Sequence, residues 1–311
     1  MKKVISISLG SSKRDHQVRT KILGEEFIIE RRGTDGDKDK AQGLFADLDG
    51  EYDAFGMGGI DLYIYSNGKQ YTFSDARKLI KDVVETPVVD GSGLKNTLER
   101  FVIDYMDKEL NISFNSKKVL MVSAMDRFGM AEELVDKGAN LVFGDLIFAL
   151  GIPLELKSLK KVDIIARIIA PIITKMPFDW LYPTGSRQEK QNEAYRKYSC
   201  YYQEADIIAG DFHFIKKYMP DDLNNKTIIT NTLTEENVTD FFKRGVEMIV
   251  TTTPELNGRS FGTNVMEAVL LALSEKNELH EEEYITLLKK IDFKPRVIKN
   301  NKEAVNLGGV V

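Results

Sequence analysis

A lysine beside glycine and acidic residues is the sharpest chemical motif in this sequence. Residues 90–97 read Asp-Gly-Ser-Gly-Leu-Lys-Asn-Thr, and Lys95 lies close to the predicted start of a helix. Free backbone N–H groups and the positive end of the helix would stabilise an anionic ligand there. If burial lowers its pKa, Lys95 could instead act as a general base for an alcohol–ketone interconversion, with Asp35 or Asp90 as its partner. A capped helix with a solvated lysine is the simpler interpretation of the same residues.

Two further glycine-rich segments offer groups that could bind or react with a ligand. Residues 56–61 end in Asp61, which could pair with a lysine. Residues 257–264 read Asn-Gly-Arg-Ser-Phe-Gly-Thr-Asn, and Arg259 in this segment could hold a carboxylate or phosphate through two hydrogen bonds. Glycine, asparagine and aspartate are also common in turns, so both segments could equally be capping loops.

Residues 117–145 have the pattern of a strand, a turn, a helix and a second strand. This is a βαβ unit, and Asp145 follows its second strand at the distance where a ribose-binding acid lies in dinucleotide folds. In the turn, Asp126 could cap the helix and Arg127 could meet a phosphate. The fingerprint G-x-G-x-x-G is absent, because Ser123, Met125 and Phe128 precede the single glycine, Gly129.

The elements around these motifs predict an α/β fold of two domains, the second Rossmann-like with a mostly parallel sheet. We expect an α/β domain with hairpins at residues 1–112, a Rossmann-like domain at 113–278, and a C-terminal helix and tail at 279–311. The pattern predicts a hairpin at residues 17–30, a strand at 152–156 and no regular structure after Pro295. In open α/β sheets ligands bind beyond the carboxyl ends of the strands, so the polar residues after each strand are the candidates.

Composition excludes several classes of protein. The formal net charge of −5 argues against binding to nucleic acid, and no apolar run approaches the roughly 20 residues of a membrane span. Cys200 is the only cysteine, and the three histidines lack metal-binding spacing. The sequence therefore predicts a cytoplasmic protein without a metal site, and it is compatible with a homodimer.

Several longer segments resemble a bacterial family that carries the name quinate 5-dehydrogenase. They are ISLGSSKRDH, IIERRGTDGD, DAFGMGGIDLY, PVVDGSGLKNTLER, SAMDRFGMAEEL and TPELNGRSFGTNVMEA, and together they span nearly the whole chain. The resemblance implies NAD(P)-dependent oxidation of quinate, with a substrate domain before a Rossmann domain, as in shikimate dehydrogenases. It also implies that Lys95 is the catalytic lysine. Ser12 and His16 have the spacing of a substrate-binding segment of those enzymes, and Asp35 echoes their N-T-D motif.

The leading expectation is therefore an NAD- or NADP-dependent dehydrogenase of a small hydroxylated carboxylic acid such as quinate or shikimate. A sugar-nucleotide-using transferase with two Rossmann-like halves, or a ligand-binding or regulatory protein without catalysis, remain open alternatives. In each case the partner is a small anionic ligand. The candidate site residues are a catalytic set, Lys95, Asp35 and Asp90; a substrate set, Ser12, His16, Gly91, Ser92, Asn96 and Thr97; and a cofactor set, Ser123, Asp126, Arg127, Gly129, Asp145, Asn231, Thr232, Gly258, Arg259 and Ser260.

Overall fold

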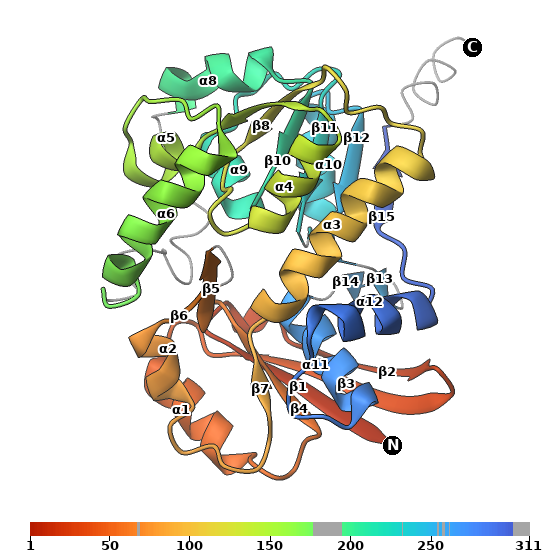
Figure 1. Ribbon diagram of the computed structural model, residues 1–311. Coiled ribbons are helices and arrows are strands. Elements are labelled where there is room, and N and C mark those ends of the chain that lie inside the picture. The colour runs from red at the N-terminus through yellow and green to blue at the C-terminus, as the bar shows by residue number, and fades with distance from the viewer. Residues whose placement is uncertain are drawn as a thin grey trace, which may run out of the picture.

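The structure is a computed structural model of the 311-residue chain. It describes residues 1–66, 69–176, 195–231, 233–253, 255–256, 259–260 and 262–300. Two sheets lie one above the other, and the long helix α3 (Ser92–Lys108) passes between them (Figure 1). The predicted α/β architecture with two sheets is therefore confirmed.

The first sheet has the strand order β2-β3-β1-β4-β7. Its strands are β1 (Lys2–Ser8), β2 (His16–Ile22), β3 (Glu25–Gly33), β4 (Ala54–Gly58) and β7 (Val88–Val89). All run parallel except β2, which pairs with β3 in the hairpin that the sequence predicted. Leu23 and Gly24 at its turn have φ values of 51° and 88°, because a tight hairpin needs two left-handed residues to follow the twist of its strands.

The second sheet has the order β15-β12-β11-β10-β8-β9 and is parallel except at β15, as predicted for a Rossmann-like unit. Its strands are β8 (Lys118–Met121), β9 (Asn140–Phe143), β10 (Ile207–Ala209), β11 (Thr227–Thr230), β12 (Met248–Thr251) and β15 (Arg296–Lys299). Every residue of β10 and β12 is buried. Unbroken apolar strands of this kind suit a parallel sheet that is covered on both faces.

Two sequence predictions about strands were wrong. The segment after Pro295 forms β15, because Val297 and Ile298 pair with the buried residues Val250 and Ile249 of β12. Residues 152–156 do not form a strand, and only Leu156 makes an isolated bridge, to Phe143. Pro153 lacks a backbone N–H to donate to a neighbouring strand, which weakens any pairing of this segment.

Helices account for most of the remaining described structure. They are α1 (Lys38–Asp47), α2 (Ser74–Leu79), α4 (Phe128–Asp136), α5 (Asp145–Leu150), α6 (Leu159–Ile173), α8 (Tyr195–Glu204), α9 (Phe212–Tyr218), α10 (Glu235–Lys243), α11 (Thr263–Ser274) and α12 (Glu281–Lys290), with the 3-10 turn η1 (Ser12–Arg14). Two short hairpins complete the list, formed by β5 (Tyr63–Ser66) with β6 (Lys69–Thr72) and by β13 (Glu255–Leu256) with β14 (Arg259–Ser260).

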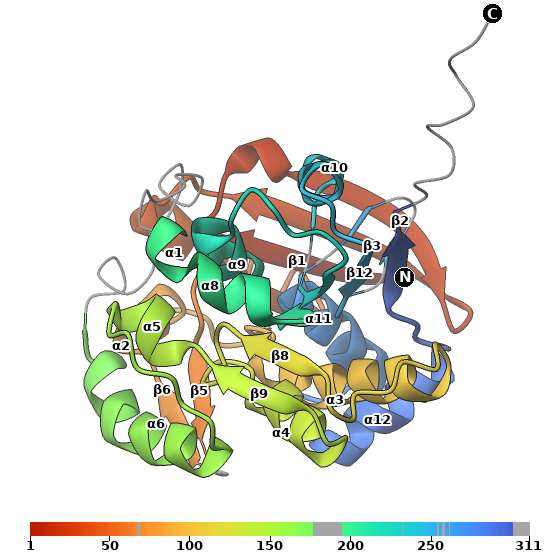
Figure 2. The ribbon, with the colours of Figure 1, turned by 90° about the horizontal axis from the view of Figure 1, so that it is seen from above.

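Helix α11 packs on the first sheet, although the expected division at residues 112 and 278 would place it with the second. Helix α11 contacts β1 and β4, and α12 packs against α3, despite their late position in the chain (Figures 1 and 2). The Asn264 side chain donates a hydrogen bond to Ser6 Oγ at 2.7 Å. Gly56 and Gly58 on β4 allow this approach, since a Cβ atom on either would lie 3.0–3.2 Å from Asn264 or Ser8. The chain thus crosses between the sheets more than once.

Gly129 is required where α4 crosses α3. A Cβ atom at Gly129 would lie 2.2 Å from Asn96 Oδ1 and 2.6 Å from the Asn96 carbonyl oxygen. We expect Gly129→Ala to lower the free energy of unfolding by about 1–3 kcal/mol, because the backbone of α3 must shift. Gly43→Ala is the matched control, since Gly43 lies in α1 with nothing within 4 Å of its added methyl group. There we expect a gain of up to about 1 kcal/mol from helix propensity. Equal urea-denaturation midpoints for the two variants would contradict the close crossing.

Candidate functional site

Each sheet has a topological switch point, where the strands on either side connect in opposite directions. In the second sheet it lies between β8 and β10, and in the first between β1 and β4. Ligands in open α/β sheets bind at such points, beyond the carboxyl ends of the strands. The segments that follow these strands are residues 122–127 and 210–211 in the second sheet and residues 9–15 and 59–62 in the first. They define the region in which a site is expected.

Helix α3 brings Lys95 to this region, and Asp90 determines where α3 begins. Asp90 Oδ1 accepts hydrogen bonds from the backbone N–H and hydroxyl of Ser92, at 2.9 and 2.5 Å. Its Oδ2 accepts from the amides of Leu62 and Tyr63, at 2.5 and 2.9 Å. Asp90 is therefore a buried structural acid that joins the start of α3 to the segment leading into β5.

The N-terminus of α3, predicted as an anion site, is occupied by a carboxylate from this same chain. Glu267 of α11 is 3% exposed and accepts a hydrogen bond from Gly91 N at 2.6 Å. Tyr284 of α12 donates to its other oxygen at 2.5 Å. Burial raises the pKa of Glu267 to about 7, although these hydrogen bonds oppose the shift. Glu267 therefore already satisfies backbone N–H groups that we expected a ligand to use.

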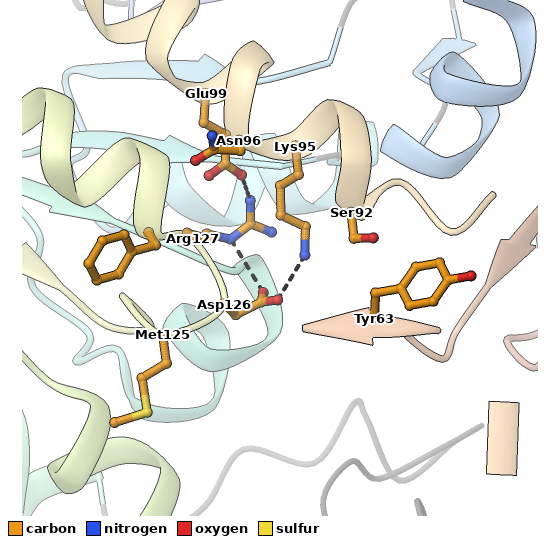
Figure 3. Close-up of a pocket in the computed structure, with 9 residues that line it drawn as sticks. Tyr63, Ser92, Lys95, Asn96, Glu99, Met125, Asp126 and Arg127 are labelled. Carbon is orange, nitrogen blue, oxygen red and sulfur yellow. Dashed lines mark hydrogen bonds and ion pairs between the residues drawn. The ribbon is translucent and has the colours of Figure 1, made fainter. Parts of the chain in front are cut away.

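A pocket lies between α3, β5 and the turn that follows β8 (Figure 3). Its cavity volume is about 40 Å³, and it is partly open to solvent. Its lining residues are Tyr63, Ser92, Lys95, Asn96, Glu99, Met125, Asp126, Arg127 and Phe128. Lys95 Nζ and Asp126 Oδ1 are 2.8 Å apart, so an ion pair from two segments distant in sequence forms part of the wall. Met125 lines the pocket beside this pair.

Lys95 is a cation in this setting, which contradicts the expectation that burial makes it a neutral base. Its side chain is only 13% exposed, and burial by itself would lower its pKa. The negative charges of Asp126 and Asp61 outweigh that effect and raise the pKa of Lys95 above its ordinary value. At neutral pH Lys95 can therefore donate a hydrogen bond or stabilise a negative charge, but it does not accept a proton.

Asp61 is the better candidate for a proton acceptor. It follows β4 in the first sheet and is partly exposed, and no hydrogen bond or ion pair of its carboxyl group is found in the described part of the chain. Burial, together with the charges of Asp126, Asp90 and Asp211, raises its pKa to about 7, although Lys95 opposes the shift. A carboxyl group with this pKa can take up and release a proton near neutral pH.

Arg127 lines the pocket with little exposure and joins three carboxylates from different elements. Its side chain is 3% exposed and pairs with Glu99 of α3, which is 1% exposed. It also lies 3.2 Å from Asp211 Oδ2 and, through Nε, 3.9 Å from Asp126 Oδ2. Burial raises the pKa of Glu99 to about 7 in spite of Arg127. This cluster connects α3 to the turns that follow β8 and β10. Figure 3 shows Arg127 between Glu99 and Asp126.

The turn after β8 does not have the geometry of a dinucleotide site. Asp145 is 4% exposed and its Oδ1 accepts a hydrogen bond from Met125 N at 2.8 Å, so it binds the turn itself. Burial raises the pKa of Asp145 to about 6. Gly129, the single glycine of the turn, faces Asn96 of α3. The residues expected to hold a pyrophosphate and a ribose are thus engaged within the protein, and they do not fit an NAD(P) cofactor bound at this turn.

The other predicted residues lie outside the pocket or behind it. Asp35 accepts a hydrogen bond from Ser12 N at 2.8 Å, which lowers its pKa, and it is placed in the turn after β3. His16 lies at the start of β2, with Nδ1 2.8 Å from Arg14 O. Thr97 is buried in α3. None of these residues lines the pocket.

Ser123 and Asn231 hold Asp211 in place. Ser123 Oγ accepts from Asp211 N at 3.1 Å, and Asn231 Nδ2 donates to Asp211 Oδ2 at 2.8 Å. Thr232 and Gly258 lie outside the described residues. Arg259 and Ser260 form β14, but the description does not extend to their side chains.

Sequence reasoning missed three residues of this region. Glu99 and Tyr63 line the pocket, and Asp211 supports Arg127. Glu99 lies four residues after Lys95, a spacing that places both on one face of a helix. Asp211 follows Gly210 directly after a strand, a pattern that applied equally well to many other turns of this chain.

Two family models match the chain. Residues 3–90 match "Domain of unknown function (DUF8753)", and residues 93–300 match "Domain of unknown function (DUF8754)". The chain belongs to the DUF8754 family. The two matches divide the chain at the start of α3, and no curated protein matches the sequence.

Solved structures with distant similarity include binding proteins and dehydrogenases. A hetero-hexameric glutamate dehydrogenase from Thermus thermophilus has 10% identity and a TM-score of 0.44, covering 94% of this chain and 74% of that one. A periplasmic ribose ABC transporter protein from Conexibacter woesei has 9% identity and a TM-score of 0.41, covering 99% and 95%. An L-tryptophan dehydrogenase from Nostoc punctiforme has 12% identity and a TM-score of 0.39, covering 93% and 79%. Similarity at this level does not indicate an activity.

The described residues contain no helix that is both long and apolar enough to span a membrane. They also contain no group of three or more histidine, cysteine, aspartate or glutamate side chains placed to hold a metal ion.

Proposed function

We propose that this protein is an enzyme that converts a small hydroxylated carboxylic acid and uses a carboxylate base to take the proton from its hydroxyl group. The observation that carries the proposal is the ion pair of Lys95 and Asp126 in a pocket beside the switch point of the second sheet. Asp61, which follows β4 of the first sheet, is near enough for its charge to act on Lys95. A permanent cation next to an acid of near-neutral pKa is the combination that general acid–base catalysis requires.

The roles of the three residues follow from their charges. Asp61, with a pKa of about 7, accepts the proton of the substrate hydroxyl and returns it in the reverse direction. Lys95 remains an ammonium and stabilises the negative charge that develops on the substrate oxygen. Asp126 holds Lys95 in place at 2.8 Å and, with Asp61, keeps it charged.

The resemblance to quinate 5-dehydrogenases suggests a specific reaction of this kind. Quinate and shikimate are small hydroxylated acids, and loss of a hydroxyl proton is one half of their oxidation. The other half needs a hydride acceptor, which NAD or NADP would supply. The turn after β8 does not fit such a cofactor, so the structure supports the proton transfer and not the hydride transfer. Formation of NADH or NADPH would show that oxidation occurs.

A binding protein without catalysis is the second candidate. Asp145 supports this alternative, because it accepts a hydrogen bond from the turn after β8. It is therefore not available to bind the ribose of a cofactor. The alternative of a sugar-nucleotide transferase needs residues 257–264 to bind the diphosphate. Several of these residues lie outside the described part of the chain.

Ligand stabilisation and a pH profile test the proposal together. We expect quinate or shikimate to raise the melting temperature in a panel that also contains NAD, NADP and a UDP-sugar. Turnover of the stabilising ligand should rise with pH through about 7, because Asp61 must lose its proton before it can accept another. Oxidation would be recognised by NADH or NADPH formation, and any other conversion by a product in the NMR spectrum of the ligand.

Asp61→Asn should abolish the rise in turnover with pH while leaving ligand stabilisation in place. Asp47→Asn is the control, since Asp47 is exposed at the end of α1. Stabilisation without turnover would favour the binding protein. A pH profile that is unchanged in Asp61→Asn would remove Asp61 from the reaction.

A further inference from the structure

One face of helix α3 forms a wall of the pocket. Four residues of this helix line the pocket, at spacings that place them on one side of it: Ser92, Lys95, Asn96 and Glu99. Figure 3 shows Lys95 and Glu99 on α3, facing Asp126 and Arg127. Glu99 follows Lys95 by about one helical turn, or roughly 6 Å along the helix axis. The proposed reaction uses Lys95 and gives no role to Glu99.

Glu99 has a carboxylate oxygen that the protein leaves without a hydrogen bond. Its side chain is 1% exposed, and Oε1 accepts a hydrogen bond from Arg127 Nη1. Across the residues that the structure describes, Glu99 Oε2 has no hydrogen-bond partner. Arg127 Nε is also buried without one, since Asp126 Oδ2 lies 3.9 Å away. A buried polar atom without a partner destabilises a protein, so a group that supplies the missing hydrogen bond is bound favourably.

The charges around Glu99 favour a neutral hydrogen-bond donor. Arg127 also contacts Asp126 and Asp211, so a carboxylate or phosphate beside Glu99 would meet three carboxylates. An ammonium group or a metal ion would be repelled by Arg127, which is already bonded to Glu99. A hydroxyl group has no net charge, donates one hydrogen bond and can accept another. It therefore suits both the unused acceptor on Glu99 and the unused donor on Arg127.

We propose that Glu99 binds a second hydroxyl group of the ligand, so that the pocket selects acids with at least two hydroxyl groups. This subsite rests on the proposed function, because it assumes the same ligand whose first hydroxyl group meets Lys95. The two side chains are one helical turn apart, so two hydroxyl groups of one small ring can lie beside them. Glu99 is almost fully buried beside a cavity of about 40 Å³, so only a small group can reach it.

A comparison of two ligands tests this subsite. Quinate and 3-hydroxycyclohexanecarboxylate share a ring, an acid group and a ring hydroxyl, and they differ in the number of hydroxyl groups. In calorimetric titrations at pH 8, we expect the wild type to bind quinate at least about 10-fold more tightly, the scale of a hydrogen bond to a charged group. The carboxyl group of Glu99 is ionised at this pH, because burial raises its pKa only to about 7.

Two variants of Glu99 measure its share of this preference for quinate. Glu99→Met removes both oxygens at similar volume and should abolish the preference. Glu99→Gln retains the hydrogen bond to Arg127 without the charge, and should reduce it. Glu132→Gln is the matched control, because Glu132 also pairs with an arginine, Arg100, but is 37% exposed and outside the pocket lining. Its preference should equal that of the wild type. The change in the ratio of affinities isolates the interaction between Glu99 and the missing hydroxyl groups.

The outcomes separate the subsite from the reaction. A wild-type preference in Glu99→Met, or in Glu99→Gln where Glu99→Met does not fold, would overturn the subsite. Equal binding of the two ligands by the wild type, or binding of neither, would also overturn it. Because the titrations are made at equilibrium, a preference that depends on Glu99 without any turnover would reject the proposed reaction and retain the subsite. Turnover of quinate with an unchanged preference would retain the reaction and reject the subsite.

Discussion

Replacement of Lys95 by methionine is expected to lower kcat/KM for the stabilising ligand at least about 100-fold, the lower end of the range for a positioned acid–base group. Methionine fills a similar volume but removes the charge that stabilises the substrate oxygen. The charge of Lys95 also lowers the pKa of Asp61. The rise in turnover with pH should therefore move to a value above 7 in this variant. The measurement is the pH dependence of kcat/KM for both proteins.

Lys108→Met provides the control for this change on the same helix. Lys108 is also paired with an aspartate, Asp104, at 2.8 Å, but its side chain is 65% exposed and far from the pocket residues along α3. We expect its kcat/KM and pH profile to match the wild type. Full activity in Lys95→Met, or an unshifted profile at reduced activity, would show that Lys95 does not act on the substrate as proposed.

Replacement of Arg127 by methionine should cost about 3–5 kcal/mol of unfolding free energy, the usual penalty for removing one partner of a buried ion pair. Glu99 is 1% exposed and Asp211 18% exposed at the side chain, so neither carboxylate is easily hydrated once Arg127 is lost. The variant should also become more sensitive to rising pH, because ionised Glu99 would have no counterion. Urea denaturation at pH 5 and pH 8 measures both effects.

Arg100→Met is the matched comparison, because Arg100 also links α3 to α4. Its partner is Glu132, and the two side chains are 27% and 37% exposed, so water can replace the lost interaction. We expect a loss below about 1 kcal/mol. The double variant Arg127→Met with Glu99→Gln should recover part of the stability by removing the unpaired charge. Equal losses in Arg127→Met and Arg100→Met would show that burial does not set the strength of the Arg127 cluster.

Local sequence patterns predicted a large part of the architecture. The βαβ unit of residues 117–145 and the hairpin of residues 17–30 were correctly predicted, because both depend on hydrophobic periodicity and turn residues within a few positions. The strand predicted at residues 152–156 was wrong because its short apolar pattern outweighed Pro153. Strand β15 was missed because its pairing with β12 connects residues about 48 positions apart.

The candidate site was only partly predictable. Lys95 and Arg127 were chosen from the sequence, and the structure places both at the pocket. The protonation of Lys95 was not predictable, because it depends on Asp126, 31 residues away, and on Asp61 in the first sheet. Glu267 could not be foreseen as the acid at the start of α3, because 176 residues separate it from Gly91.

The order of residues was thus sufficient for the α/β class and for a second, mostly parallel sheet. It also led to segments 90–97 and 123–129, parts of which line the pocket. It was not sufficient for the partner of each charged group. Helices and strands arise from interactions between near neighbours, whereas a pKa or an occupied N–H group depends on which distant carboxylate packs against it. These distant partners meet only when the two sheets and α11 pack together. In this protein the packing places Asp126 and Asp61 near Lys95, which keeps Lys95 charged. It also places Asp145 where it accepts a hydrogen bond from the turn after β8.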